Sequence, residues 1–565
     1  MRRRTQEAKH ADAIENQGVH GHGPYGFDVF GLAATLWADE APAPGATAPA
    51  AAAAPAPPKP DPSGAATGTI ADVPAKEAGK PTLQEVAETA GHNRISINMM
   101  WTLIAGFLVM FMQAGFALVE TGFCRAKNAA HTMLMNFMVY AVGMTGFWIL
   151  GFGLQMGGVG ALSTLSGGTG GLDGEFVINL FGKDFGLWGT KGFFLQGVGY
   201  DAAVFTLFLF QMVFMDTAAT IPTGAMAARW KLSAFMIYAF FISMISYPIF
   251  ANWVWGGGWL ATLGKNFGLG HGHVDFAGSS VVHMVGGVTA LVGAMVLGPR
   301  IGKFNKDGAP NAIPGHHLPM AILGTFVLAF GWFGFNAGST LAGTDLRIGV
   351  VAVNTMLASA SGAIIAALYM WFRFGKPDPS MACNGLLAGL VAITAPCAFV
   401  NSVSAFVIGA IAGVLVCWSV FFVERTLKLD DPVGAISVHG VCGAWGVLSL
   451  GLFADGVYGD GFNGVPGTVK GLLYGDTSQF FAQCIGTLTC FAFIFGISWL
   501  FFKVQHAVMG IRVSAETEIE GLDIPEVGAL AYPDFTIIPG HSLPAGQKAM
   551  SSMSPSMARV AKETL

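Results

Sequence analysis

The fold is decided by the stretch Asp275-Phe-Ala-Gly-Ser-Ser-Val-Val-His283-Met-Val-Gly-Gly, which apolar residues continue as far as Leu297. Its length and apolar character are those of a membrane span. At 1.5 Å per residue, His283 lies about 10 Å below the start of the span at Phe276. An ionisable side chain at that depth is a candidate functional residue.

The same pattern returns later in the chain, where Val438-His439-Gly-Val-Cys-Gly echoes Val282-His283-Met-Val-Gly-Gly. A single histidine in a helix is more often a packed structural residue. A matched pair in two spans with little other charge instead favours a pathway or a cofactor role. Burial disfavours the charged imidazolium, so two facing neutral rings can share a hydrogen bond, solvate a small polar molecule or pass a proton.

The composition is that of a polytopic membrane protein. Of 565 residues, 53% are hydrophobic and 11% charged, whereas a soluble domain has about 25% charged residues. The 78 glycines suit closely packed membrane helices. The seven cysteines show no CxxC spacing, so we expect neither a disulfide framework nor a metal site, and we expect no cofactor. No basic patch suggests nucleic acid.

Eleven apolar segments of about 18 to 27 residues predict an all-α protein with eleven transmembrane helices. Approximately, the segments cover 95–121, 132–156, 202–228, 233–258, 276–298, 318–341, 348–372, 381–399, 403–424, 433–454 and 480–502.

Three parts are expected along the chain. Residues 1–94 are interpreted as a disordered extension, because an Ala/Pro tract at 41–61 cannot bury a core, and 29–38 resembles a weak signal sequence. Residues 95–504 form the membrane domain. Residues 505–565 form a C-terminal tail.

Basic residues in the loops predict the orientation. One side holds Arg125, Lys127, Arg229, Lys231, Arg300, Lys303, Lys306, Arg373, Lys376, Arg425, Lys428, Lys503 and Arg512, and the other holds Lys183, Lys191, Lys265, Arg347 and Lys470. The positive-inside rule then places the N-terminus outside and the C-terminus in the cytoplasm, in the cell (inner) membrane.

With this orientation the two histidine spans run in opposite directions, so the pattern is an inverted repeat. Spans 1–5 and 6–10 are predicted to be halves related by a pseudo-two-fold axis, with one extra helix, and such folds place the substrate at the midplane. A weaker echo links Gln113-Ala-Gly-Phe with Asn336-Ala-Gly-Ser.

Aromatic residues cluster at the outer end of several spans. Phe210 and Phe214 share a helix face, Phe335 and Ser339 lie near the outer end of span 6, and Trp255 ends span 4. Ring faces with one hydroxyl can hold a small cation. Packing and interfacial anchoring are the competing interpretations.

Three acidic residues accompany the spans. Asp275 precedes the first turn of its helix, where its carboxylate is expected to cap free backbone amides rather than to bind a cation directly. Glu120 ends span 1 and is interpreted as structural. Asp216 lies within span 3, and the sequence offers no physical account of it.

Specific motifs resemble those of the ammonium transporter (Amt/MEP/Rh) family, on its Amt side. Besides the two histidine runs, they are Gly331-Trp-Phe-Gly-Phe-Asn-Ala-Gly-Ser339, Trp255-Gly-Gly-Gly, Arg125-Ala-Lys-Asn and Asp430-Asp-Pro. The likeness covers about residues 95–530. Ser339 is where the Rh branch differs.

The resemblance implies an ammonium transporter or channel, not an enzyme, that recruits ammonium outside, deprotonates it and passes ammonia and a proton inward. It also implies a homotrimer with one pore per subunit, and often a PII-type signal protein as a cytoplasmic partner. The implied site residues are the pore histidines His283 and His439, the gate Phe214 and Phe335, the outer recruitment site Phe210, Trp255 and Ser339, and the structural Asp275.

The chain departs from the family pattern in its long N-terminal extension, in Asp216 at a position that is usually small, and in Val527, where a histidine is common in the tail. Two alternatives remain open. The histidines can instead ligate a haem from opposite sides, as in an electron-transfer protein. The chain can also be a sensor, which would need a separate signalling partner.

Overall fold

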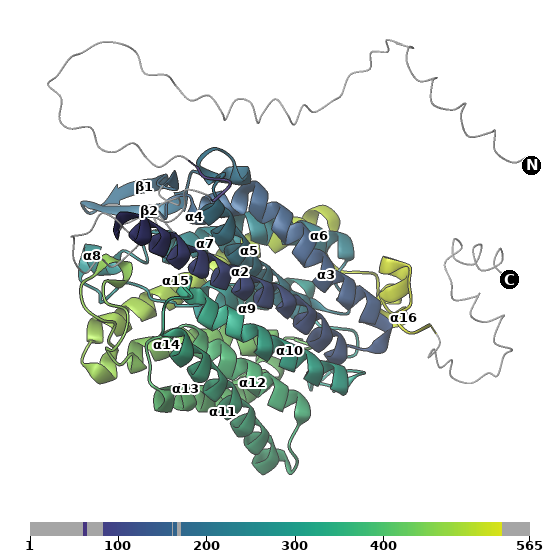
Figure 1. Ribbon diagram of the computed structural model, residues 1–565. Helices are drawn as coiled ribbons and strands as arrows, with labels where there is room; N and C mark the ends of the chain where they lie inside the picture. The colour runs from purple at the N-terminus through teal and green to yellow at the C-terminus, as the bar shows by residue number, and fades with distance from the viewer. Residues whose placement is uncertain (1–59, 65–82, 161, 166–170, 534–565) are drawn as a thin grey trace, which may run out of the picture. The chain divides into compact units, whose positions relative to one another are not determined.

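All eleven predicted apolar segments are helical in the computed structural model, which describes residues 60–64, 83–160, 162–165 and 171–533 (Figure 1). The first half comprises α2 Leu83–Phe123, α3 Ala129–Gly146, η3 Phe147–Gly151, α4 Phe152–Met156, β1 Glu175–Leu180, β2 Lys183–Gly189, α5 Ala202–Met226, α6 Leu232–Phe241, η7 Ile242–Ser246, α7 Tyr247–Trp255, α8 Leu263–Phe267, η8 Ser279–Met284 and α9 Val285–Leu297. The second comprises α10 Leu318–Asn336, η9 Ala337–Thr340, α11 Ile348–Phe374, α12 Pro379–Thr394, α13 Ser402–Arg425, η10 Ile436–Val441, α14 Cys442–Phe453, α15 Thr477–Met509, α16 Ala515–Glu520 and η13 Asp523–Val527.

Among these described residues, ten helices are long and apolar enough to cross a membrane. The eighth segment, α12, has 16 residues and is about 24 Å long at 1.5 Å per residue. Asp378, just before its first turn, lines the same cavity as Arg300. At its other end, the Thr394 carbonyl accepts a hydrogen bond from the amide of Ala277, two residues after Asp275. Its ends therefore lie at opposite faces of the protein, which is compatible with eleven crossings.

Helix packing repeats between the two halves. In the first half α2 packs on α5 and α5 on α9, and in the second α10 packs on α12 and α12 on α14. The helices that open the halves, α2 and α10, also pack on each other, and η8 contacts η10. These matching pairs agree with the predicted inverted repeat of five plus five helices, to which α15 is added.

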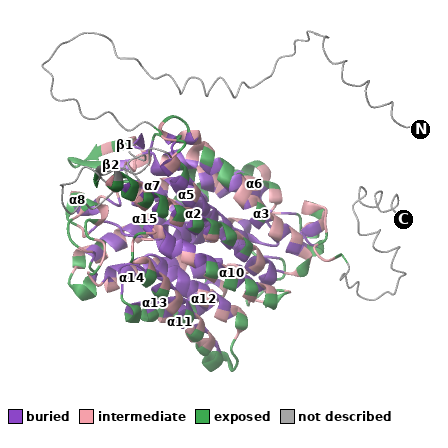
Figure 2. Cartoon of the chain, viewed as in Figure 1, coloured by how far each residue is buried: buried purple, intermediate pink, exposed green. Residues whose placement is uncertain are grey.

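The helices differ in how far they are buried. Nearly every residue of α5 is buried, whereas α10, α11 and α13 carry large apolar residues that are exposed, and Figure 2 colours exposed positions of the ribbon green. Examples of these exposed side chains are Phe326, Phe330, Val353, Ile364, Val403 and Trp418. Apolar patches of this kind match a lipid environment, and α5 forms the centre of the packing.

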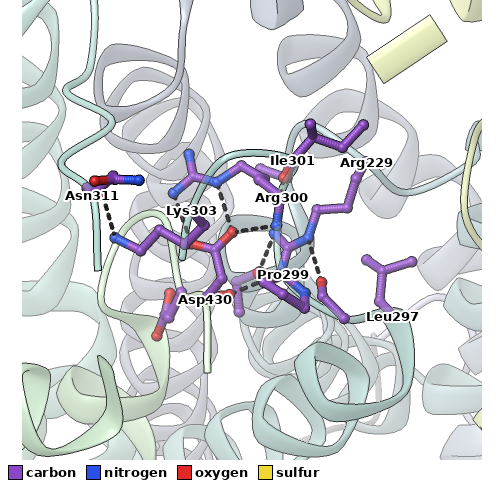
Figure 3. A network of polar contacts seen from close by, with 12 residues as sticks. Arg229, Leu297, Pro299, Arg300, Ile301, Lys303, Asn311 and Asp430 are labelled. Carbon is purple, nitrogen blue, oxygen red and sulfur yellow. Dashed lines mark hydrogen bonds and ion pairs between the residues drawn. The ribbon is translucent and has the colours of Figure 1, made fainter. Parts of the chain in front are cut away.

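The loops with most of the basic residues meet at one end of the helices, here called the basic face. Figure 3 shows its centre, where the Arg300 guanidinium donates two hydrogen bonds and the Arg300 backbone amide a third to the Asp430 carboxylate, each 2.8 Å long, and Arg229 donates to the Asp430 carbonyl. Burial raises the pKa of Asp430, but the hydrogen bonds from Arg300 and the charges of Arg229 and Arg300 outweigh it and hold this pKa well below its ordinary value.

Part of the predicted tail also packs on the basic face. Helix α15 continues to Met509, beyond the predicted span, and Arg512 then donates to the carbonyls of Leu297 and Pro299. The Glu518 carboxylate accepts from the backbone of Ile301 and from Arg512. The segment from Arg512 to Val527 therefore ties several basic-face loops together.

The face opposite the basic face carries the hairpin β1–β2, which was not predicted from the sequence. Its strands pair antiparallel with a bulge at Phe176/Val177, and Figure 1 shows the hairpin and α16 at opposite ends of the helices. Asn252 donates to Glu175 at the start of β1. Burial raises the pKa of Glu175 to about 7, although the Asn252 hydrogen bond lowers it.

Two parts of the predicted extension have defined structure. Helix α2 begins at Leu83, before the expected boundary at Ile95. Residues 60–64 form a turn, in which the Asp61 amide donates to the carboxylate of Asp201, the residue that caps α5. The signal-like segment 29–38 and most of the Ala/Pro tract lie outside the described residues.

Candidate functional site

A cavity of about 220 Å³ opens between the helix ends at the opposite face. The three side chains of the implied recruitment site, Phe210, Trp255 and Ser339, all line it. The lining also includes residues that were not singled out in the sequence, among them Gln211, Leu341, Phe462 and Asn463. We call this space the outer cavity.

The polar groups of the outer cavity are oriented by the backbone. The Ser339 hydroxyl donates to the Phe335 carbonyl at 2.7 Å, so its oxygen lone pairs remain available to a ligand with N–H donors. The indole of Trp255 donates to the Asp275 carbonyl at 2.7 Å, which fixes its ring at the cavity wall. Aromatic faces beside an oxygen acceptor suit a small cation.

Two phenylalanines lie next to the outer cavity. The rings of Phe214 and Phe335 are stacked with their centroids 4.2 Å apart and an interplanar angle of 23°. Both side chains are almost fully buried. Phe210 contacts Phe214 at 4.6 Å, so the aromatic residues form a continuous row leading inward from the cavity.

The two histidines follow this phenylalanine pair. The His283 ring stacks on Phe335 at 5.4 Å, and its Nδ1 lies 3.2 Å from the Nδ1 of His439. One Nδ1 must carry the hydrogen and the other must accept it, because a donor and an acceptor are both required. His283 Nε2 is buried without a hydrogen-bond partner among the described residues.

Both histidines lie in π-helical turns, His283 in η8 and His439 in η10. Such turns widen a helix locally and occur frequently at functional sites. The repeat thus extends from the sequence motif to the backbone geometry that places the rings.

Asp275 fixes the start of η8. Its Oδ1 accepts from the amides of Gly278 and Ser279, and its Oδ2 accepts from the amides of Ser280 and Val281 and from the Ser280 hydroxyl. These are the contacts that the capping interpretation requires.

A neutral histidine lies beside this cap. His273 shares a hydrogen bond of 2.9 Å with the Ser280 hydroxyl, and burial lowers its pKa to about 4 against the opposite effect of the Asp275 charge. Burial therefore favours the uncharged form of His273.

The remaining acidic candidates lie elsewhere. Asp216 is buried on α5, and its Oδ1 has no hydrogen-bond partner among the described residues, for which the structure gives no reason. Glu120 is buried at the end of α2 and accepts hydrogen bonds from Asn136 and Thr223.

The histidine pair does not fit a haem. A haem iron bound from both sides would have to lie between the two ligand nitrogens, but the Nδ1 atoms are within hydrogen-bond distance of each other. Within the described residues, no group of three or more His, Cys, Asp or Glu side chains is arranged to hold a metal ion.

Comparisons with known proteins agree on one family. A sequence profile of the Ammonium Transporter Family matches residues 100–532. Ammonium transporter Amt2 of Archaeoglobus fulgidus is 48% identical over 452 residues, which cover 80% of this chain and 91% of the relative. Ammonium transporter Amt1 of Haloferax mediterranei is 37% identical over 454 residues, which cover 78% of this chain and 80% of the relative.

Solved structures show the same likeness. A Sensor Amt Protein superposes with a TM-score of 0.66 at 37% identity, covering 77% of this chain and 99% of that chain. Candida albicans Mep2 superposes with a TM-score of 0.64 at 27% identity, covering 77% of this chain and 90% of that chain.

Proposed function

Since this chain belongs to the ammonium transporter family, on its Amt branch, we propose that it moves ammonium across a membrane through the row of residues described above. Ammonium is held in the outer cavity by Phe210, Trp255 and Ser339. It gives up a proton there, and ammonia and the proton pass separately through the gate formed by Phe214 and Phe335 to the histidine pair. The histidine pair then carries ammonia and the proton onward.

The observation that carries this proposal is the unbroken order of outer cavity, stacked phenylalanines and hydrogen-bonded histidines. Ammonium and potassium have nearly the same size, so a cage of oxygen ligands separates them poorly. Only ammonium can lose a proton before it enters a dry passage, and potassium is therefore excluded. Deprotonation gives the passage its selectivity.

The test is electrical recording from purified protein in liposomes. We expect a current under an ammonium gradient and none under an equal potassium gradient. Equal currents for the two ions would contradict the proposed selectivity.

Assembly and location follow as further proposals. We propose a homotrimer with one passage per subunit in the cell (inner) membrane, with the basic face in the cytoplasm. We also propose a PII-type signal protein as a partner there, with Asp275 serving only to hold η8. The three-part division at residues 94 and 504 remains a prediction.

The orientation can be tested by cysteine labelling. Lys80→Cys should react with an impermeant thiol reagent added outside, and Gly540→Cys should not, because eleven crossings put the ends on opposite sides. Background labelling should be low, since six of the seven native cysteines are buried, and Cys484→Ser removes the half-buried one. Labelling of both positions from outside would overturn the topology.

The recruitment site can be tested by removing its polar and aromatic contacts. Ser339→Ala and Trp255→Leu should each weaken the apparent affinity for ammonium by about 1–2 kcal/mol, because a desolvated cation loses a hydrogen bond or a ring face. Affinity is measured from the concentration dependence of the current. Trp148→Leu is a matched control, because this partly exposed tryptophan lies outside the cavity lining. Unchanged affinity in both test variants would rule out the assignment.

A further inference from the structure

A second, much smaller cavity lies beyond His439, on the side of the basic face. It has a volume of about 20 Å³, which is room for at least one water molecule. Two of its lining residues are titratable, His439 and Glu120. The rest of its lining is apolar apart from Asn384.

Glu120 is an unusual residue for this place. Its side chain is 2% exposed, and its hydrogen-bond donors are neutral: Asn136 Nδ2 and Thr223 Oγ1 donate to Oε2 at 2.8 and 2.5 Å, and the backbone of Gly224 also donates to the carboxylate. Burying a carboxylate without a cation is costly. A glutamine oxygen would accept the hydrogen bonds from Asn136 and Thr223 at a lower cost, so these two contacts alone do not explain an acid here.

The small cavity lies next to a larger cavity at the basic face. Asn384 and Val433 line it and also line a cavity of about 450 Å³ among the basic-face loops. That larger cavity has three more acidic residues in its lining, Asp378, Glu424 and Asp431. A proton that reaches Glu120 is therefore separated from a polar space by one layer of side chains.

We propose that Glu120 takes up the proton which the histidine pair releases, through a water molecule in the small cavity, and passes it toward the basic face. Ammonium divides into ammonia and a proton; the proton protonates the pair, and the imidazolium returns to neutral as the Glu120 carboxylate becomes a carboxylic acid. The acid then gives the proton to water in the larger cavity and becomes a carboxylate again. This inference rests on the proposed function.

The main test is Glu120→Gln in the full-length protein in liposomes. The variant keeps an oxygen that accepts from Asn136 and Thr223 but cannot take up a proton. The ammonium current should fall at least about tenfold, since a positioned acid or base contributes about a hundredfold or more to proton transfer. Ammonia entry, measured as alkalinisation of the liposome interior, should stay near the wild-type rate. Glu120→Asp should restore part of the current.

The control is Asp307→Asn, which removes an exposed carboxylate from the same face, away from both cavities, and should leave the current unchanged. A second variant leaves Glu120 in place: Ala435→Val fills the small cavity and should also lower the current while sparing folding.

The outcomes distinguish a failure of the role of Glu120 from a failure of the proposed function. Wild-type current in folded Glu120→Gln, or equal loss of current and ammonia entry, overturns the role of Glu120 and leaves ammonium transport intact. If Glu120→Gln does not fold, an unchanged ammonium current in Ala435→Val overturns the role of Glu120. Absence of any ammonium current in the wild-type protein instead refutes the proposed function.

Discussion

Replacing His283 or His439 with alanine should lower the ammonium current between about fivefold and a hundredfold. Each variant removes one partner of the Nδ1 to Nδ1 hydrogen bond and leaves the other ring unpaired in a buried passage, a loss of about 1–3 kcal/mol. The measurement is the current of His283→Ala and of His439→Ala in liposomes, each checked by size-exclusion chromatography for its folded oligomer.

His131→Ala is a matched control, because His131 is also a buried histidine on a membrane helix, but its ring has no hydrogen-bond partner among the described residues. It should retain most of the current. Currents of wild-type size in both pore variants would remove the basis of the proposed relay. Misfolding of both without any folded protein would indicate a structural pair.

His283→Asp should change selectivity as well as rate. The ring of His283 lies between Phe335 and His439, so a carboxylate there puts a fixed negative charge into a narrow apolar passage. Such a charge attracts water and bare cations. Potassium current should therefore appear in this variant, although none is expected from the wild type.

The helices were predictable because membrane spanning depends on local composition. Each span needs about 20 apolar residues, and that requirement can be read from the chain without knowing its neighbours. The ends were less predictable: α2 and α15 extend beyond the expected spans at Leu83 and Met509. The start of α15 at Thr477 also precedes the expected span, and it is set by capping, since the Asp476 carboxylate accepts from the amides of Ser478 and Gln479.

The row of site residues was predictable only from family motifs. Periodicity puts Phe210 and Phe214 on one helix face, but nothing local brings Phe335 to within 4.2 Å of Phe214. The π-helical turns at His283 and His439 also have no sequence signal of their own. They depend on contacts such as those that Asp275 makes with four successive amides.

Residues from distant loops were missed for the same reason. Phe462 and Asn463 come from a glycine-rich connection between α14 and α15, yet both line the outer cavity. Asn463 donates to the His271 carbonyl, a contact that no spacing rule predicts. Glu120 is interpreted as structural from its place at the end of span 1, and the sequence alone does not show that it lines a small cavity together with His439.

Asp430→Asn should destabilise the protein by about 3–5 kcal/mol, because it leaves the buried Arg300 guanidinium without its counterion. Asp430 is 1% exposed and Arg300 is 4% exposed, so water cannot replace the lost carboxylate. The measurement is unfolding of the purified protein by denaturant at pH 7. Glu424→Gln is the control. The Glu424 side chain is 26% exposed, so its ion pair with Lys303 should contribute only about 0–1 kcal/mol to the free energy of unfolding.

The pH dependence identifies the charge as the cause. Because the pKa of Asp430 is held below its ordinary value, its contribution is fully present above that ordinary pKa of about 3.9 and is lost as the pH falls toward the folded-state pKa. The stability difference between wild type and Asp430→Asn should therefore be constant from about pH 5 to pH 8 and should shrink at lower pH.

A double variant separates charge from packing. Arg300→Met with Asp430→Leu removes both charges and fills much of the same space, and such replacements of buried pairs are often neutral or stabilising. Arg229 keeps its hydrogen bonds to the carbonyls of Ala225 and Ala227 in either case. The double variant should regain most of the stability that Asp430→Asn loses. Equal losses in the single and double variants would mean that packing at the basic face, and not the neutralisation of Arg300, accounts for the effect.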